Sequence, residues 1–330
     1  MRYRLRSIYW RKVYYNTMKN ISIKQLQDWD AFIHQDGPLL STALMESILS
    51  SLHIPYTLLT RSIVAGLLKP RKPFSHKGTY GHALLMAGNT GKMGAALLAA
   101  KACLRSGAGL LTLAIPENTA AIVFTALPEA MVLNRNQETI LWKDYQAIGA
   151  GPGLGTDEVS GRLMEQLLQQ AQQPLVLDAD ALNWLSVQQG WSKLVPANTI
   201  LTPHPKEFDR LFGNSTNEFE RWQKALDASL QYGWVIVVKG HYTLIAAKGK
   251  AWFNTNTNAG LAKGGTGDCL TGMITAFAAQ GYTAEQAAIL GVYVHGQAAN
   301  CALRFQSVES LLASDVIAAI GEAFEQLHAK

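Results

Sequence analysis

A glycine-rich turn that ends in a carboxylate, Gly264-Gly265-Thr266-Gly267-Asp268, precedes a predicted helix over residues 269–280. Glycines let the backbone come close to a ligand, and the first N–H groups and the dipole of a helix favour an anion such as phosphate. A carboxylate at this position could act as a general base on a hydroxyl aligned with that phosphate. The alternative is a helix N-cap by Asp268 in a turn that binds nothing.

Two further glycine-rich turns each connect a predicted strand to a predicted helix. One spans residues 88–95 and ends at Ala95, and the other is GPGLG at residues 151–155, centred on Gly153. The first is not a P-loop, because only two residues separate its first glycine from Gly-Lys, and Met93 follows the lysine. The second lacks the spacing of a dinucleotide-binding fingerprint. Each turn either contacts a ligand or simply joins two elements.

Two histidines have contrasting sequence surroundings. His204 stands between Pro203 and Pro205, which restrict the backbone and would hold the imidazole in place for substrate contact. The alternative is a capped loop in which Glu207 begins a helix. His295 lies on a largely apolar predicted helix, where a histidine is expected to be a hydrogen-bonded core residue.

Charged residues follow two more predicted strands. Asp178 and Asp180 could together hold Mg²⁺, directly or through water, or Asp180 could cap the next helix. The segment Lys239-Gly240-His241-Tyr242-Thr243 could surround the phosphate or ribose of a nucleotide, or be a loop with an exposed lysine.

Short apolar runs alternate with helical stretches from Gly81 onward. Apolar strands without polar alternation indicate a parallel sheet covered on both faces, and the strand–helix alternation indicates an α/β domain. Ligands of such sheets bind at the carboxyl ends of strands, where most of the clusters above fall. The predicted strands are 83–87, 110–115, 147–149, 175–177, 199–201, 235–238, 243–247 and 251–253, the last two as a hairpin; the predicted helices are 95–106, 160–173, 269–280, 284–304 and 314–328, the last with Ser314 as its N-cap.

Composition and charge narrow the functional classes. The chain has 330 residues and a net charge of +5, but six cations and no acid occupy residues 1–20, so the rest of the chain is nearly neutral. This distribution does not favour nucleic-acid binding. The sequence contains no run of about 18 apolar residues, so no membrane span is predicted. The three scattered cysteines have no metal-ligand spacing and fit a reducing compartment.

The N-terminal part is interpreted as a basic leader and a short helical prefix over residues 1–67, ahead of a main domain over residues 68–330. The leader is a targeting segment, a basic arm, or an extension upstream of a true start at Met18. Apolar residues at helical spacing predict helices within residues 18–60. Residues 68–78 have the composition of a linker.

The residues of these motifs and their order along the chain resemble those of the NAD(P)H-hydrate dehydratase family, which has a ribokinase-like fold. The resemblance covers about residues 81–320 and rests on GNTGKMGAA, RSGAG, GPGLG, LDADALN, TPHPKEF, VVKGHYT and NAGLAKGGTGDCLTG. It implies a central, mostly parallel sheet between helices. It also implies a hydro-lyase that restores NADH or NADPH from the hydrates NADHX and NADPHX, with ADP or ATP as co-substrate and Mg²⁺ on the nucleotide phosphates.

The resemblance also implies roles for individual residues. Asp268 would be the catalytic base and would contact the hydrate together with Ala95, Gly153 and His204. The nucleotide would be bound by two segments, Lys239 to Thr243 and the anion-binding turn Gly264, Gly265, Thr266 and Gly267. A cytoplasmic homo-oligomer, a tetramer, is implied as well.

Two other functions are considered alongside this resemblance. A kinase of a vitamin alcohol shares the fold and the Gly-x-Gly-Asp chemistry, and a nucleotide-binding module without turnover would not need Asp268. Residues 20–46 resemble the opening of a hydrate epimerase domain, but the rest of that domain is missing, so no epimerase activity is expected.

Overall fold

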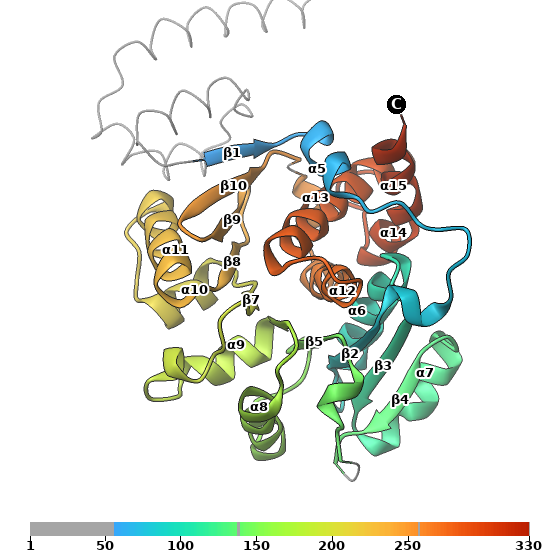
Figure 1. Ribbon diagram of the computed structural model, residues 1–330, viewed down its shortest axis with the longest axis vertical. Coiled ribbons are helices and arrows are strands. Elements are labelled where there is room, and N and C mark those ends of the chain that lie inside the picture. The colour runs from blue at the N-terminus through green and yellow to red at the C-terminus, as the bar shows by residue number, and fades with distance from the viewer. Residues whose placement is uncertain (1–55, 137–138, 257, 330) are drawn as a thin grey trace, which may run out of the picture.

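The computed structural model describes residues 56–136, 139–256 and 258–329, and the strands of this part form one ten-stranded sheet (Figure 1). The strand order is β1-β10-β9-β8-β7-β6-β5-β2-β3-β4, and only β9 runs antiparallel to its neighbours, β8 and β10. The mostly parallel sheet is thereby confirmed. The strands are β1 (Tyr56–Leu59), β2 (His82–Met86), β3 (Leu110–Ile115), β4 (Met131–Asn134), β5 (Ala147–Ala150), β6 (Leu175–Leu177), β7 (Ile200–Leu201), β8 (Val235–Val238), β9 (Thr243–Ala247) and β10 (Lys250–Asn254).

Both faces of the sheet are buried, which explains why its strands are continuous apolar runs. Along β2, Ala83 and Leu85 belong to one hydrophobic cluster, whereas Leu84 and Met86 belong to the other, and all four side chains are fully buried. Successive side chains of a strand point to opposite faces, so a strand covered on both faces must be apolar at every position.

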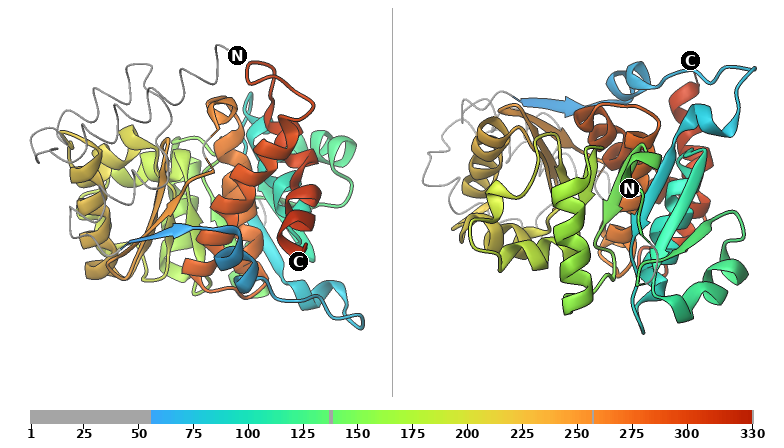
Figure 2. Two further views of the ribbon diagram at one scale, coloured as in Figure 1. Left: turned by 90° about the horizontal axis from the view of Figure 1, so that it is seen from above. Right: turned by 60° about the horizontal axis from the view of Figure 1, so that its bottom comes forward.

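Helices cover the two faces as separate layers (Figures 1 and 2). The first layer packs α12 between α6 and α13, with the C-terminal helices beside them. The second layer lies on the opposite face and holds α8 to α11. The first layer contains α5 (Arg61–Leu67), α6 (Met93–Arg105), α7 (Ala120–Ala126), α12 (Thr266–Ala279), α13 (Ala284–Ala302), α14 (Ala313–Ala318) and α15 (Ile320–His328); the second contains α8 (Glu158–Gln170), α9 (Ala179–Ser186), α10 (Pro205–Phe212) and α11 (Glu218–Tyr232).

The predicted helix over residues 314–328 is wrong in two respects. The segment is two helices, because α14 ends at Ala318 and α15 begins at Ile320. Ser314 is not the N-cap, since it lies inside α14. The start of α14 is held instead by Asp315, whose carboxylate accepts a hydrogen bond from the backbone N–H of Leu312 at 2.9 Å.

The sheet starts upstream of the predicted domain boundary. Strand β1 pairs in parallel with β10, with Tyr56 opposite Ala251, and thus extends the sheet to residues that were predicted to belong to the helical prefix. Residues 1–55, which carry the leader and most of that prefix, lie outside the described residues. The division into a leader, a prefix and a main domain therefore stays a prediction, but its boundary does not coincide with the edge of the sheet.

The structure also bears on membrane-spanning helices and on the three cysteines. Within the part of the chain that the structure describes, no helix has the length and hydropathy needed to cross a bilayer. Cys103, Cys269 and Cys301 are all buried and unpaired, and burial raises the pKa of the Cys269 thiol to about 12. The three cysteines are therefore small core residues.

We expect Gly272→Ala to unfold the protein at lower denaturant concentration, because α6 and α12 pack backbone to backbone at this position. A Cβ on Gly272 would lie 1.9 Å from the carbonyl oxygen of Ala99 in α6, so the two helices would have to separate. We expect a loss of about 3 kcal/mol in the free energy of unfolding, measured by urea titration. The matched control is Gly321→Ala in α15, whose Cβ would enter open space; a similar loss there would contradict the packing argument.

Candidate active site

The candidate site residues follow strands that are neighbours in the sheet. Lys239 follows β8, His204 comes shortly after β7, Asp178 follows β6, and Gly153 comes shortly after β5. These four strands are adjacent and parallel, so their carboxyl ends meet at one edge of the sheet. The turn that precedes α12 reaches the same edge, since Thr271 of α12 bonds to Asp178.

The glycine-rich turn opens α12 directly. The helix begins at Thr266 rather than at residue 269, and Gly265 is its N-cap, with a φ of +92° that favours glycine. The hydroxyl of Thr266 points back to the carbonyl oxygens of Leu261 and Lys263, at 2.8 and 2.9 Å. No side chain caps this helix. The prediction that Asp268 is only an N-cap is therefore wrong, and the uncapped N–H groups of the first turn are suited to an anion.

Asp268 lies in the first turn of α12 and has an unusual acidity. Burial raises the pKa of its carboxyl to about 6, with Asp178 and Asp180 raising it further and Lys239 opposing them. A carboxylate with a pKa near neutrality can both accept and release a proton under physiological conditions. The chemistry of a general base thus fits this position.

Beneath the turn, Asp178 joins α12 to the loop after β8. One carboxylate oxygen of Asp178 accepts from the ammonium of Lys239 at 2.6 Å, and the other accepts from the hydroxyl of Thr271 at 2.6 Å. The Asp178 side chain is 2% exposed and that of Lys239 is 21% exposed. A Cβ on Gly267 would lie 3.6 Å from the Lys239 ammonium, so this cation lies directly behind the glycine-rich turn.

The predicted role of Asp178 and Asp180 as Mg²⁺ ligands does not fit these contacts. Both oxygens of Asp178 are occupied by protein donors. Asp180 accepts from the backbone N–H of Gly155 at 2.8 Å and from the ammonium of Lys92 at 3.3 Å. Within the described residues, no three His, Cys, Asp or Glu side chains are grouped as metal ligands. Asp180 does not cap α9 either, because Asp178 stands at the N-cap position.

The two other glycine-rich turns lie against each other. The backbone N–H of Gly88 donates to the carbonyl of Pro152 at 2.8 Å, and a Cβ on Gly153 would lie 3.0 Å from that of Ala95. Gly153 has a φ of +59°, a conformation that favours glycine. The structure thus brings together Ala95 and Gly153, which are 58 residues apart in the sequence.

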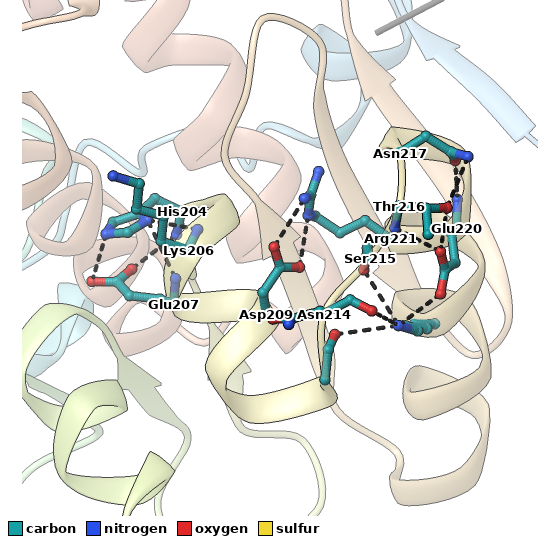
Figure 3. A network of polar contacts seen from close by, with 12 residues as sticks. His204, Lys206, Glu207, Asp209, Asn214, Ser215, Thr216, Asn217, Glu220 and Arg221 are labelled. Carbon is teal, nitrogen blue, oxygen red and sulfur yellow. Dashed lines mark hydrogen bonds and ion pairs between the residues drawn. The ribbon is translucent and has the colours of Figure 1, made fainter. Parts of the chain in front are cut away.

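His204 is both an N-cap and a candidate ligand contact (Figure 3). Its Nδ1 accepts from the backbone N–H groups of Lys206 and Glu207 at 3.1 and 3.3 Å, while the Glu207 carboxylate accepts from the His204 backbone N–H. Since Nδ1 is an acceptor, the neutral ring carries its proton on Nε2. Burial, then Lys239, lower the pKa of His204, so the ring is neutral at pH 7. The loop is capped as in the alternative interpretation, although α10 begins at Pro205 rather than at Glu207. The Nε2 atom of His204 lies 3.4 Å from a carboxylate oxygen of Glu207, so a ligand that accepts the Nε2–H would compete with this contact.

Figure 3 also shows that α10 is tied to α11 beyond the site. Asp209 of α10 forms a two-pronged ion pair with Arg221 of α11, at 3.2 and 3.1 Å. The side chain of Arg221 is 10% exposed, so the pair is largely shielded from water. This contact fixes the helix that His204 caps.

The segment from Lys239 to Thr243 divides into exposed and buried residues. Gly240 and His241 are exposed and can meet a nucleotide. Tyr242 is 6% exposed and belongs to the hydrophobic core under α11, so its ring is not available for nucleotide contact. Thr243 begins β9.

Sequence reasoning missed two residues at this edge and placed a third correctly. Thr271 lies three positions after Asp268, one turn along the same helix, and this spacing could have indicated it. Arg135, which bonds to both glycine-rich turns, has no motif that could have indicated it.

His295 is 8% exposed, and burial lowers its pKa to about 4, but its Nε2 has no hydrogen-bond partner within the described residues. It is the core histidine predicted, without the full hydrogen bonding.

Comparison with known proteins gives a consistent result. The family model for NAD(P)H-hydrate dehydratase matches residues 83–321. An ADP-dependent (S)-NAD(P)H-hydrate dehydratase of Bacillus subtilis is 38% identical over 276 residues, which is 81% of this chain and 98% of that protein. A bifunctional NAD(P)H-hydrate repair enzyme of Vibrio cholerae is 40% identical over 76% of this chain. The chain spans about half the length of such bifunctional relatives, 51% in that case.

Solved structures agree with the sequence comparisons. The ADP/ATP-dependent NAD(P)H-hydrate dehydratase from Bacillus subtilis, co-crystallised with ATP/Mg²⁺, has a TM-score of 0.73 and 34% identity, and covers 84% of this chain and 99% of that one. A hydroxyethylthiazole kinase from Pyrococcus horikoshii has a TM-score of 0.53 but 16% identity, and covers 76% and 89%. The second likeness concerns the fold alone.

Proposed function

Because this chain belongs to the NAD(P)H-hydrate dehydratase family, we propose that it removes water from (S)-NAD(P)H hydrate and so restores NADH or NADPH. The observation that carries the proposal is the Asp268 carboxyl, whose pKa is raised to about 6 beside the uncapped first turn of α12. A carboxylate with a raised pKa retains more basicity than an ordinary one, and the nearby Lys239 ammonium offsets part of its repulsion from phosphate.

The reaction that fits this arrangement has two steps. Asp268 takes the proton of the ring hydroxyl while the hydroxyl oxygen attacks the terminal phosphorus of ADP. The bond between this phosphorus and the bridging oxygen then breaks, which releases AMP. The phosphate ester on the ring then departs as inorganic phosphate. A proton leaves the neighbouring ring carbon, and the carbon–carbon double bond of the dihydropyridine returns. The sum is hydrate plus ADP giving NAD(P)H, AMP, phosphate and a proton.

The proposed binding roles follow the surroundings of each residue. The phosphates of the nucleotide would meet the N–H groups of the Gly264–Gly267 turn, with the Lys239 ammonium supplying positive charge behind them. Gly240 and His241 would lie along the nucleotide. Ala95, Gly153 and His204 would contact the hydrate. Tyr242 is left out of the contact set because its ring is in the core.

Mg²⁺ is proposed to arrive with the nucleotide rather than to reside in the protein. The two candidate ligands, Asp178 and Asp180, are occupied by protein donors, and Mg²⁺ is commonly held by nucleotide phosphates and water. ADP is proposed as the donor, as the name of the Bacillus subtilis relative indicates for that protein. A homotetramer and a cytoplasmic location stay predictions from the family resemblance.

The test is a recovery assay. The purified protein is incubated with NADH hydrate, Mg²⁺ and either ADP or ATP, and the return of NADH absorbance is followed together with AMP or ADP release. Recovery that depends on one nucleotide establishes the reaction and names the donor. Failure to recover NADH with either nucleotide, from folded protein, would overturn the proposal and direct attention to vitamin alcohols as kinase substrates.

His204→Asn should separate the two functions of this histidine. Asparagine can still accept the N-terminal N–H bonds of α10, so stability should change by less than about 0.5 kcal/mol. It loses the Nε2–H, and we expect KM for the hydrate to rise about tenfold while KM for ADP stays constant. His204→Ala, which removes the cap as well, is the comparison. An unchanged KM for the hydrate in His204→Asn would exclude His204 as a substrate contact.

A further inference from the structure

A pocket of about 270 Å³ lies beyond the candidate active site, at the carboxyl ends of β3 and β4. Its lining includes Asn89, Asn118, Arg135 and Asp157. Strands β3 and β4 continue the sheet past β2, so the pocket lies on the same edge that carries the site. Asn89 and Thr90 of the first glycine-rich turn line it, but none of the residues that the family resemblance assigned to the hydrate or the nucleotide does.

One glycine separates this pocket from the acidic side of the site. The backbone N–H of Gly155 donates to Asp180, one of the carboxylates that raise the pKa of Asp268. On its other side, a Cβ on Gly155 would lie 2.6 Å from the side-chain nitrogen of Asn89 and 2.7 Å from Asp157, both of which line the pocket. A ligand that extends from Asp268 past the glycine-rich turns therefore meets the pocket next.

Arg135 gives this pocket its distinctive chemistry. Its side chain is buried, at 7% exposure, and its terminal nitrogens donate to the carbonyl oxygens of Gly88 at 2.7 Å and Leu154 at 3.3 Å. Its Nε has no hydrogen-bond partner, and it joins none of the ion pairs within the described residues. Asp157 acts on it only at longer range, and that carboxylate already accepts from Ser160 and Asn89.

A buried cation without a directly bonded counter-charge is costly, and a guanidinium has five donors, only two of which serve the glycine-rich turns. Carbonyl groups satisfy hydrogen bonds but do not neutralise charge. An anionic ligand group with several acceptor oxygens would complete such a site, and phosphate suits the guanidinium fork. The asparagine and threonine side chains around the pocket suit the hydroxyls of a sugar.

We infer that this pocket binds the adenosine-phosphate half of the dinucleotide hydrate, with Arg135 as the contact for its phosphates. The inference rests on the proposed function. With the nicotinamide ring at Asp268 and the nucleotide donor on the β8 side, the remaining half of the substrate must extend toward β2, β3 and β4. From β5, which leads to Gly153, to β4 is three strand spacings, about 14 Å, a span that a dinucleotide can cover.

The experiment compares a whole substrate with one that lacks the adenosine-phosphate half. The kinetics of the wild type and of Arg135→Gln are measured with NADH hydrate and with the hydrate of reduced nicotinamide mononucleotide. In the wild type, KM should be at least about tenfold higher for the mononucleotide. Arg135→Gln should raise KM for NADH hydrate by about the same factor and leave KM for the mononucleotide hydrate and for ADP unchanged.

Two outcomes would overturn the inference. An equal rise in both hydrate KM values would mean that Arg135 only supports the glycine-rich turns, and no rise would mean that the pocket is unused. If the wild type itself fails to act on NADH hydrate, the proposed function fails and this inference falls with it. An active wild type with equal KM values for the two hydrates would remove the inference alone.

A second variant guards against misfolding of Arg135→Gln, since Arg135 bonds to two turns. Asn118 is an exposed residue of the pocket lining, and Asn118→Asp adds a negative charge without changing the size of the side chain. It should raise KM for NADH hydrate several-fold and leave KM for the mononucleotide hydrate unchanged. The matched control is Asn214→Asp, an exposed position in the loop between α10 and α11. Equal effects at the two positions would contradict a local contact.

Discussion

Asp268→Asn should reduce kcat for NADH recovery by about a thousandfold, within the range for loss of a general base. Asparagine has nearly the same size and can occupy the same place in the first turn of α12, but it cannot accept the proton of the ring hydroxyl. Because the change removes a proton acceptor and not a binding surface, KM for ADP should stay within a few-fold of wild type. Single-turnover recovery of NADH absorbance measures the step directly.

The pH dependence of the wild type gives an independent check of the same residue. The base must be deprotonated, and burial raises the pKa of Asp268 to about 6, so kcat/KM should fall as the pH drops through about 6. Asp227→Asn, an exposed change on α11, is the control and should preserve both rate and pH profile. An acid limb near pH 4, or substantial activity in Asp268→Asn, would assign the base to another group.

Asp178→Asn should have the second largest effect, on stability and on activity together. It leaves the Lys239 ammonium without its carboxylate in a site where Asp178 is 2% exposed. Breaking a buried pair costs about 3–5 kcal/mol, and we expect the lower end because Lys239 is 21% exposed. Release of Lys239 from its position behind Gly267 should lower kcat about a hundredfold. Denaturant unfolding and steady-state kinetics measure the two effects.

A double variant distinguishes a positioning role of Asp178 from a purely structural one. In Asp178→Asn with Lys239→Met, the unpaired charge is gone, so much of the stability should return while activity stays low. The pH profile adds a second readout. Asp178 raises the pKa of Asp268, so its neutralisation should move the acid limb of kcat/KM below about 6. Recovery of activity along with stability would show that neither Asp178 nor Lys239 takes part in the reaction beyond folding.

Most of the fold could be predicted from the sequence because the pattern there is local. Buried parallel strands are continuous apolar runs, and 110–115, 175–177, 235–238 and 243–247 were predicted with the bounds that the structure has. Strands β1 and β4 were missed. Both lie at the edges of the sheet, where strands are less buried: no residue of β4 is buried, and only two of the four residues of β1 are.

The residues of the candidate site were also indicated by the sequence, through glycine spacing, prolines and position after strands. Asp268, His204 and Lys239 lie at one edge of the sheet, as the strand order requires. The protonation behaviour of these side chains could not be predicted from the sequence. The pKa of Asp268 depends on burial and on Asp178 and Asp180, which lie about 90 residues away in the chain.

The tertiary structure alone decided how these groups are partnered. Asp178 had the sequence surroundings of a metal ligand, but the folded chain pairs it with Lys239 and Thr271. Tyr242 stood within a predicted nucleotide-binding segment, yet its ring lies in the core just before β9 begins. Arg135 had no motif at all, and what distinguishes it is its burial without a bonded carboxylate among the described residues. Local sequence determines which backbone conformations and side chains are present, whereas hydrogen-bond partners and burial depend on segments far apart in the chain.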